Sequence, residues 1–256
     1  VAILTATHSL EQNIRANLDK MGDEVVYIQK WPWGFGGNYE WWDYMNRPEA
    51  TLKEYQRFVK EVKPDIIHET GFTFDFGNNK LKSPLEELTN VKINAVDGSF
   101  MEINQWKILL GRTFSEFELN KGKNVGVLGY NIAVNLFGGS NPVGRDIKLN
   151  GVNLTIIGVL EKQGNSLGGP QYDDVLVLPA KYATRFAKPN TNGVGSAIVV
   201  KGQDQVDLKY LDYEIKRVMR PMRRLKPKDK DDFAINKLTM FSDNLSQTFG
   251  VIDAVA

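Results

Sequence analysis

The two histidines of the chain, His8 and His68, are the first residues to consider for chemistry, because imidazole titrates near neutral pH and binds metals. They lie far apart in the sequence, neither has a second histidine at metal-ligand spacing, and the chain contains no cysteine. We expect His8 to be exposed near a helix start and His68 to be a solvated or hydrogen-bonded sheet residue. The sequence therefore predicts no metal site.

Asp173 and Asp174 could act together as an acid/base pair or bind a cation. Adjacent carboxylates in a turn before a strand more often cap an element or face solvent. The chain has no G-x-S-x-G elbow, P-loop or dinucleotide fingerprint. The glycine-rich pieces 34–37 and 164–169 lack the lysine or helix start that a phosphate cradle needs. We therefore predict no catalytic, cofactor-binding or metal residues and no enzyme activity in this segment.

A basic run is the largest charge feature, and it admits three interpretations. Aspartates interrupt it and the formal net charge is only +1, which argues against nucleic acid as a partner. Cations at the end of a solvated helix, where they complement its dipole, are the preferred interpretation, and contact with an acidic partner domain is the third. The run comprises Lys216, Arg217, Arg220, Arg223, Arg224, Lys226, Lys228 and Lys230.

The stretch 31–44 holds four of the five tryptophans. Tryptophan and tyrosine combine apolar area with a polar tip, which favours a contact surface for a partner or for lipid headgroups. Alternatively, these rings cover the underside of their own domain. The candidate partner contacts are Trp31, Trp33, Phe35, Trp41 and Trp42, with Leu167 in the second glycine-rich loop.

Hydrophobic periodicity predicts the elements that position these residues. Helices are expected at 10–21, 51–62, 129–137, 179–186 and 206–218, the last ending or kinking near Pro221, with a terminal helix at the end of the chain. Strands are expected at 24–29, 65–76, 88–96, 124–128, 175–178, 196–200 and 233–236, with a turn at Asn78-Asn79 and a short helix or turn within 97–110.

The segment 138–162 has the strongest pattern in the chain. Asn150-Gly151 suits a type I′ turn between two alternating runs. A two-residue loop sets Leu149 opposite Val152 and Ile147 opposite Leu154, all on one face of a hairpin.

At 256 residues and 42% hydrophobic composition, the chain can bury a substantial core. Helix–strand units at both ends flank a strand-dominated middle, which favours an α+β fold with a β-rich segment inserted into an α/β unit. The chain begins without methionine and ends within an apolar helical pattern. We expect from this a segment of a larger, membrane-anchored protein.

Several pieces, in order along the chain, resemble the MacB-like periplasmic core domain of FtsX-like ABC transporter permeases. The stretch 8–22 followed by Val26 to Trp33 resembles the start of that domain, and its Trp-Pro-Trp variant is similar to permeases of Bacteroidetes-type bacteria. The later pieces are 106–114, 127–138, 141–145, 155–160, 174–179 and 232–236, so the resemblance covers nearly the whole chain.

This resemblance implies two lobes: a porter-like α/β lobe from residues 1–75 and 197–256, and an inserted, β-rich, sabre-like lobe from residues 76–196. It also implies that residues 1–4 and 250–256 are the ends of two membrane helices, and that the domain lies on the periplasmic side of the bacterial inner membrane. Its implied task is mechanotransmission, in which ATP hydrolysis in the cytoplasm drives export or extraction of a substrate. ATP would bind a separate nucleotide-binding domain, so the family offers no catalytic residues here.

The implied partners are a second permease copy or paralogue, an ABC ATPase subunit or domain, and a periplasmic adaptor or envelope protein. One alternative function is FtsX-like activation of an envelope partner such as a cell-wall hydrolase. A free-standing soluble ligand-binding protein or enzyme is the other. An apolar run of roughly 20 residues next to either end would separate a permease from the soluble protein.

Overall fold

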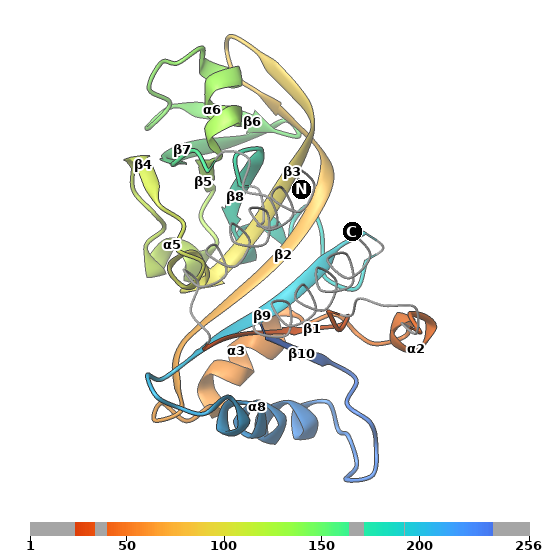
Figure 1. Ribbon diagram of the computed structural model, residues 1–256. Coiled ribbons are helices and arrows are strands. Elements are labelled where there is room, and N and C mark those ends of the chain that lie inside the picture. Colours follow the sequence, from red (N-terminus) through yellow and green to blue (C-terminus); the bar gives the residue numbers. More distant parts are fainter. Residues whose placement is uncertain (1–23, 34–39, 164–171, 192, 238–256) are drawn as a thin grey trace, which may run out of the picture.

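The computed structural model describes residues 24–33, 40–163, 172–191 and 193–237. Ten strands form one mixed sheet in the order β10-β1-β9-β2-β3-β8-β5-β7-β4, and β6 pairs with β2 and β7 beside this path (Figure 1). The pairs β3–β8 and β5–β7 are parallel, whereas the others are antiparallel. The strands are β1 (Val25–Gln29), β2 (Ile67–Lys82), β3 (Glu87–Gly98), β4 (Ile108–Gly111), β5 (Val125–Leu128), β6 (Asp146–Leu149), β7 (Val152–Leu160), β8 (Val175–Pro179), β9 (Gly195–Gly202) and β10 (Ala234–Lys237).

The helices are short and lie around this sheet, which confirms the predicted mixed α+β class. They are α2 (Trp42–Met45), α3 (Leu52–Glu61), α4 (Phe100–Ile103), α5 (Glu116–Lys121), α6 (Tyr130–Phe137), α7 (Ala180–Ala183) and α8 (Leu208–Met222). Helices α3 and α8 pack together at one end of the molecule, and α6 lies towards the other (Figure 1). Helix α8 ends one residue after Pro221, as predicted. Within the described ranges, no helix combines the length and apolar character needed to cross a bilayer.

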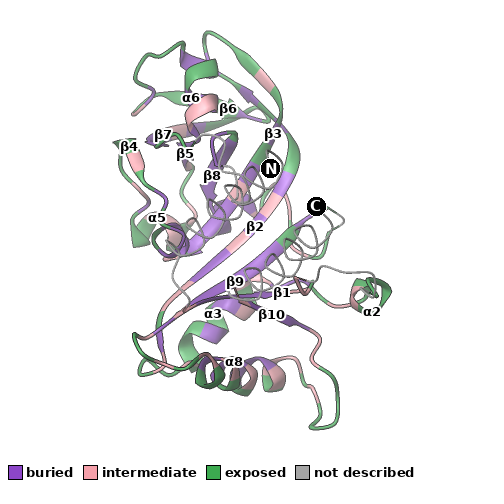
Figure 2. Cartoon of the chain, in the orientation of Figure 1, coloured by how far each residue is buried: buried purple, intermediate pink, exposed green. Residues whose placement is uncertain are grey.

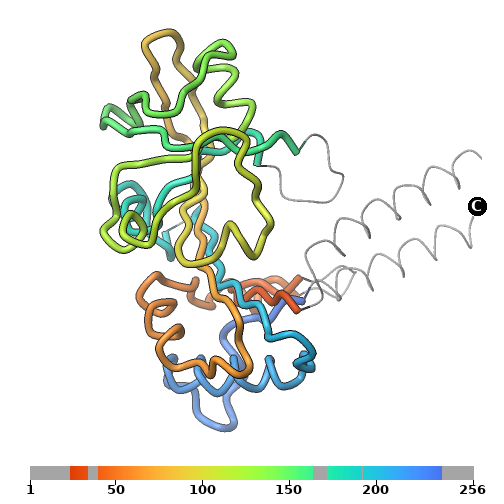
Figure 3. Tube along the Cα trace, turned by 90° about the vertical axis from the view of Figure 1, so that its left-hand side faces the viewer, coloured from red at the N-terminus to blue at the C-terminus, as the bar shows by residue number. Residues whose placement is uncertain are grey.

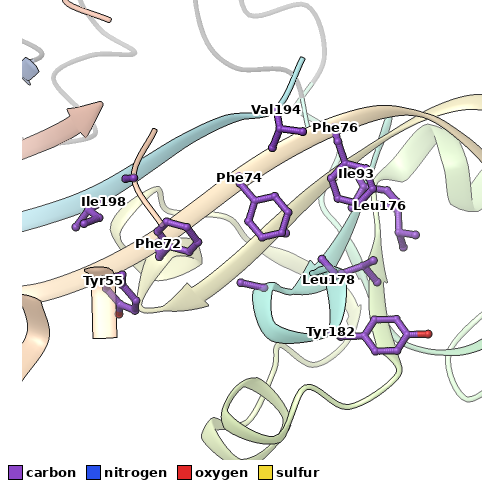
Figure 4. Packing of buried hydrophobic residues seen from close by; sticks show 14 of the residues in the cluster. Tyr55, Phe72, Phe74, Phe76, Ile93, Leu176, Leu178, Tyr182, Val194 and Ile198 are labelled. Carbon is purple, nitrogen blue, oxygen red and sulfur yellow. The ribbon is translucent and has the colours of Figure 1, made fainter. Parts of the chain in front are cut away.

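Strand β2 carries a ladder of three phenylalanines on one face of the sheet. Phe72, Phe74 and Phe76 alternate along the strand, and neighbouring ring centroids lie 6.1 Å and 5.9 Å apart. Tyr55 of α3 stacks on Phe72 with a centroid distance of 5.6 Å, so the ladder connects α3 to the middle of the sheet (Figure 4). The same hydrophobic cluster continues to Leu149 of β6.

A second cluster covers the other face of the sheet. Val25 and Tyr27 of β1 and Val199 of β9 contribute to it, together with Phe100 of α4 and the nearby Trp106. The centres of the long strands are therefore buried on both sides, whereas α2 and the loops are exposed (Figure 2). The Tyr27 hydroxyl donates to Asn104 Oδ1 at 2.7 Å, and burial raises the pKa of this phenol, which keeps it neutral.

The predicted turn at Asn78-Asn79 is wrong, because β2 continues through these residues to Lys82. A bulge after Phe76 accommodates one extra residue, with Asn78 at a φ of 62°. The Asn79 side chain donates to Gly77 O at 3.0 Å and to Val91 O at 3.2 Å, which satisfies carbonyls near the break in register. Asparagine tolerates positive φ in a bulge as well as in a turn, so the Asn78-Asn79 pair is compatible with either structure.

The hairpin of β6 and β7 has the predicted register, with Ile147 opposite Leu154 and Leu149 opposite Val152. Asn150 and Gly151 have φ values of 48° and 89°, as a type I′ turn requires. The turn also docks on the β2 bulge, because Asn150 Nδ2 donates to Asn79 Oδ1 at 3.0 Å. The bulge and the turn therefore fix each other.

The proposed lobe boundaries fall inside two strands. Positions 75/76 lie within β2 and positions 196/197 within β9, and both strands continue across them. The main hydrophobic cluster includes Phe58 of α3 as well as Ile147 of β6, so it extends on both sides of these boundaries.

Helix α8 is held against α3 by charged groups, and the cations at its end are not simply solvated. Glu214 has a side chain only 1% exposed and accepts from Lys63 N at 2.9 Å and from two Arg217 nitrogens at 2.8 Å and 2.6 Å. Arg223, 5% exposed, donates to Glu54 at 2.9 Å and to Asp232 Oδ1 at 3.2 Å. Much of the basic run is thus satisfied within its own domain.

We predict that Gly71→Ala lowers the free energy of unfolding by about 2 kcal/mol or more. A Cβ at Gly71 would lie 2.6 Å from Phe100 Cα, where α4 crosses β2. Gly77→Ala in the same strand is the control, because its Cβ meets nothing within 4 Å. Urea unfolding followed by circular dichroism measures both variants. Equal stabilities would show that α4 does not need this close approach.

We predict that the Glu214–Arg217 interaction makes stability depend on pH. The hydrogen bonds from Arg217 hold the pKa of Glu214 below its usual range. The stabilisation is therefore complete above the pKa of about 4.3 in the unfolded chain, and it is lost as pH falls through the lower folded-state pKa.

Glu214→Gln should accordingly cost about 1–3 kcal/mol at pH 7 and progressively less towards pH 3. Asp212→Asn, which removes a partly exposed pair with Lys216 on the same helix, should change stability by no more than about 0.5 kcal/mol. A Glu214→Gln cost that stays constant across this pH range would contradict the assignment.

Candidate functional site

The residues considered for catalysis have structural partners. His68 is half-exposed, with Nε2 4.0 Å from Glu69 Oε1, whereas His8 lies outside the described residues. Asp173 Oδ1 accepts from Gln163 N at 2.9 Å, and Asp174 accepts from Asn131 Nδ2 at 3.1 Å. Asp174 thus contacts the first turn of α6, whereas the Asp173 carboxylate fixes the backbone after β7. Across the described ranges, no three histidine or acidic side chains are grouped to hold a metal ion.

Trp41 and Trp42 form an outward-facing aromatic surface. Their side chains are 52% and 55% exposed, and their rings meet edge to face with centroids 5.8 Å apart. They begin α2, which stands away from the sheet (Figure 1). Met45 on the same short helix is also half-exposed. The other predicted contacts, Phe35 and Leu167, lie outside the described residues.

Trp31 and Trp33 are held against the end of β1 by Asn236 of β10. The Asn236 side chain donates to Trp31 O at 2.9 Å and accepts from Trp33 N at 2.9 Å. The Trp33 ring packs on Tyr27 with a centroid distance of 5.2 Å, whereas Trp31 is 37% exposed. Trp33 thus extends the second core cluster, and Trp31 faces outward beside it.

A cleft of about 630 Å³ lies beside these two tryptophans. Its floor is the sheet, with Gln29 of β1, Thr73 and Asp75 of β2 and Ala197 of β9. The remaining described lining includes Lys30, Trp31, Trp33, Arg47, Glu49, Asn190 and Ser196, and it does not include Trp41 or Trp42. The structure therefore divides the predicted contacts between a cleft and a separate exposed surface.

Glu49 is a lining residue that no sequence pattern indicated. It is 9% exposed, and its Oε2 accepts from Ser196 N at 3.2 Å and from Ser196 Oγ at 3.1 Å. Its backbone N–H donates to Asn190 Oδ1 at 2.6 Å. These partners are more than 140 residues away in the sequence, so no local pattern could reveal the arrangement.

The cleft and the aromatic surface lie towards one end of β1, and β1 begins at its other end. Val26 pairs with Lys237 and Gln29 pairs with Ala234, so the chain enters β1 and leaves β10 on the same side. Trp31 follows the opposite end of β1. The two ends of this strand, Val25 and Gln29, are roughly 13 Å apart at 3.3 Å per residue. In Figure 3, β1 (red) lies in the same half of the molecule as α3 (orange) and α8 (blue).

We predict that two of these tryptophans differ in their contribution to stability. Trp33→Ala should lower the free energy of unfolding by about 2–3 kcal/mol, because the ring is packed on Tyr27. Trp41→Ala should change it by no more than about 0.5 kcal/mol, because that ring is more than half exposed. Urea unfolding followed by far-UV circular dichroism avoids the fluorescence change that losing a tryptophan causes. Equal losses would show that Trp41 is also part of a packed core.

Known proteins resemble this chain over most of its length. The family model of the MacB-like periplasmic core domain matches residues 1–218. The macrolide export ATP-binding/permease protein MacB of Chlorobaculum tepidum is 29% identical over 255 residues, which is 97% of this chain and 37% of that protein. The chain thus spans little more than a third of that relative.

Solved structures share the fold. The periplasmic region of MacB from Actinobacillus actinomycetemcomitans superimposes with a TM-score of 0.68 at 17% identity, covering 93% of this chain and 97% of that one. The extracellular domain of the transporter YknZ from Gram-positive bacteria gives a TM-score of 0.60 at 16% identity, covering 82% and 98%. With the family match, these likenesses confirm the resemblance drawn from the sequence. This chain belongs to the MacB-like periplasmic core domain family and is a periplasmic domain of an ABC transporter permease of the inner membrane.

Proposed function

We propose that this domain is a non-catalytic mechanotransmission element that couples cytoplasmic ATP hydrolysis to export of a substrate. The observation that carries this proposal is that β1 begins and β10 ends at one end of their strand pair, with the cleft and Trp41 beyond the other end. Movement of membrane segments joined to these two strands would act on one side of the sheet. The opposite side would then move against a partner or substrate.

The continuous sheet supports this proposal. We propose residues 1–75 and 197–256 as the porter-like lobe and residues 76–196 as the sabre-like lobe. Strands β2 and β9 are paired and continue across both boundaries between these lobes. The two lobes would then move together rather than about a loose connection. ATP would bind a separate nucleotide-binding domain or subunit, so this segment would need no cofactor.

We further propose that the Trp41–Trp42 surface contacts a periplasmic adaptor in a transporter built from two permease copies or paralogues. Exposed tryptophans are frequent anchors of protein interfaces. A protein contact is favoured over lipid headgroups, because this surface lies beyond the end of β1 opposite to the end at which β1 begins and β10 ends. Export is the direction given in the name of the Chlorobaculum tepidum relative.

The same exposed pair favours one other candidate, an FtsX-like role in which the domain activates an envelope partner such as a cell-wall hydrolase. Both roles need a protein contact at this surface. They differ in the consequence of losing it, which is reduced export in one case and reduced hydrolase activity in the other.

We predict that replacing both Trp41 and Trp42 with alanine uncouples the full-length permease. Export, measured as growth of a complemented deletion strain in a macrolide, should fall severalfold, because the adaptor contact is lost. ATP hydrolysis by the purified permease with its ATPase should persist. Cell-wall hydrolase activity in the same strains separates the FtsX-like role.

The control replaces Tyr210 and Tyr213 of α8, which are 67% and 68% exposed, with alanine. This pair removes similar exposed aromatic area elsewhere and should leave growth unchanged. Unchanged growth of the tryptophan variant, or equal loss in both variants, would contradict the proposed contact.

A further inference from the structure

We propose that the cleft beside Trp31 binds a small molecule bearing an ammonium group, and that the Glu49 carboxylate is its counter-ion. This inference goes beyond the proposed transport role, which it would supplement with a ligand site on the periplasmic domain. It stands on the geometry of the cleft and does not depend on the Trp41–Trp42 contact.

Glu49 is a buried carboxylate without a cation. It is 9% exposed and lines the cleft, yet no lysine, arginine or histidine of the described residues lies within ion-pair distance of it. Asp75, the other acidic residue of the lining, is already paired with Lys92 at 3.3 Å. A buried charge that keeps no counter-ion is costly, and a bound cation would offset that cost.

The two cationic side chains of the lining, Lys30 and Arg47, contact aromatic rings and not Glu49. Lys30 Nζ lies over the Trp31 ring at 5.2 Å from its centroid, and the Arg47 guanidinium lies over Tyr44 at 4.6 Å. Both are partly exposed at the rim. Trp31 therefore already supports an ammonium group on its ring, and the same kind of contact is available to a ligand amine in the cleft.

The carboxylate is fixed before any ligand arrives. Ser196 donates to Glu49 Oε2 from its backbone N–H and its hydroxyl, or uses that hydroxyl to donate to Ala50 O at 2.8 Å. Asn190 holds the Glu49 backbone at 2.6 Å, and Arg223 contacts Pro48 O at 3.5 Å. Both of these Ser196 hydrogen bonds reach Oε2, so Oε1 keeps acceptor capacity. Such preorganisation reduces the entropy lost on binding.

Size and composition narrow the ligand class. A volume of about 630 Å³ lies within the usual range for small-molecule sites. On the floor, the Thr73 hydroxyl donates to Asn94 Oδ1 at 2.7 Å and keeps acceptor capacity, and the Gln29 amide keeps its N–H donors because its oxygen accepts from Asn236 Nδ2 at 3.0 Å. Trp31 and Trp33 provide the aromatic wall. An amine on an aromatic or otherwise planar apolar scaffold with a hydroxyl group would match each of these features.

The competing explanation is that Glu49 only fastens the loop before α3 to β9. Glutamine at this position keeps a carbonyl oxygen that can accept both Ser196 bonds, but it removes the charge. Glu49→Gln therefore separates fastening from ligand recognition. The variant should unfold at the same urea concentration as the wild type, or at a higher one.

The experiment titrates the 256-residue chain with tyramine and with 2-(4-hydroxyphenyl)ethanol, which replaces the ammonium group by a hydroxyl. Binding is followed by NMR at pH 7 and low salt, using the indole signals of Trp31 and Trp33. We expect tyramine to bind at least about tenfold more tightly than the alcohol, as a charge-assisted hydrogen bond implies. Glu49→Gln should weaken tyramine about tenfold or more and leave the alcohol unchanged.

Asp75→Asn is the matched control, because Asp75 lines the same cleft but has Lys92 as its partner. It should change tyramine binding by less than about threefold. Equal binding of the two probes, no binding of either, or a tyramine affinity unaffected by Glu49→Gln would each overturn the proposal. Each of those results would leave the export test with the Trp41–Trp42 variant unaffected.

Discussion

Phe72, Phe74 and Phe76 point to one face of β2, and the packing of the described structure depends on this ladder. On one side β2 pairs with β9, and on the other it pairs with β3, which joins it to the rest of the sheet. Burial of each ring contributes roughly 1.5–3 kcal/mol relative to exposure. Tyr55 extends the ladder to α3, so a helix at one end of the molecule and a hairpin at the other share one cluster.

The cleft depends on the same sheet. Its floor consists of side chains on the face of β1, β2 and β9 opposite the phenylalanines, and its rim is fixed by single side chains from distant segments. Asn236 of β10 holds Trp31 and Trp33, and Ser196 of β9 holds Glu49. The buried side chains of Asn236 and Ser196 thus fix the positions of residues that line the cleft. A rigid sheet lets these bonds keep their geometry.

The sequence predicted features whose causes are local. The Asn150-Gly151 turn and its register followed from two residues and an alternating pattern, and the α+β class from the order of elements. Helix α5 was missed although Ser115 and Glu118 form a capping box, because its one and a half turns give little periodicity. The family itself was identified from short pieces whose order is specific, not from any site residue.

The remaining features depend on contacts between distant segments. In the sequence, Asn78-Asn79 is typical of a turn. The structure has a bulge there, and Asn150, 72 residues after Asn78, hydrogen-bonds to Asn79 beside it. Glu49 looks like an ordinary surface acid in a loop, and only the fold brings Ser196 and Asn190 to it. Trp33 and Trp41 cannot be told apart in the sequence, yet one packs on Tyr27 and the other is exposed.

The continuity of β2 across Asp75 and Phe76 also determines how the molecule deforms. Bending there would stretch the ladder bonds that β2 makes with both β9 and β3, and it would separate the stacked rings of Phe74 and Phe76. The resistance to bending is therefore high at the point where a two-domain protein would have its hinge. Under the proposed function, a force applied at one edge of the sheet would reach the opposite edge through these paired strands.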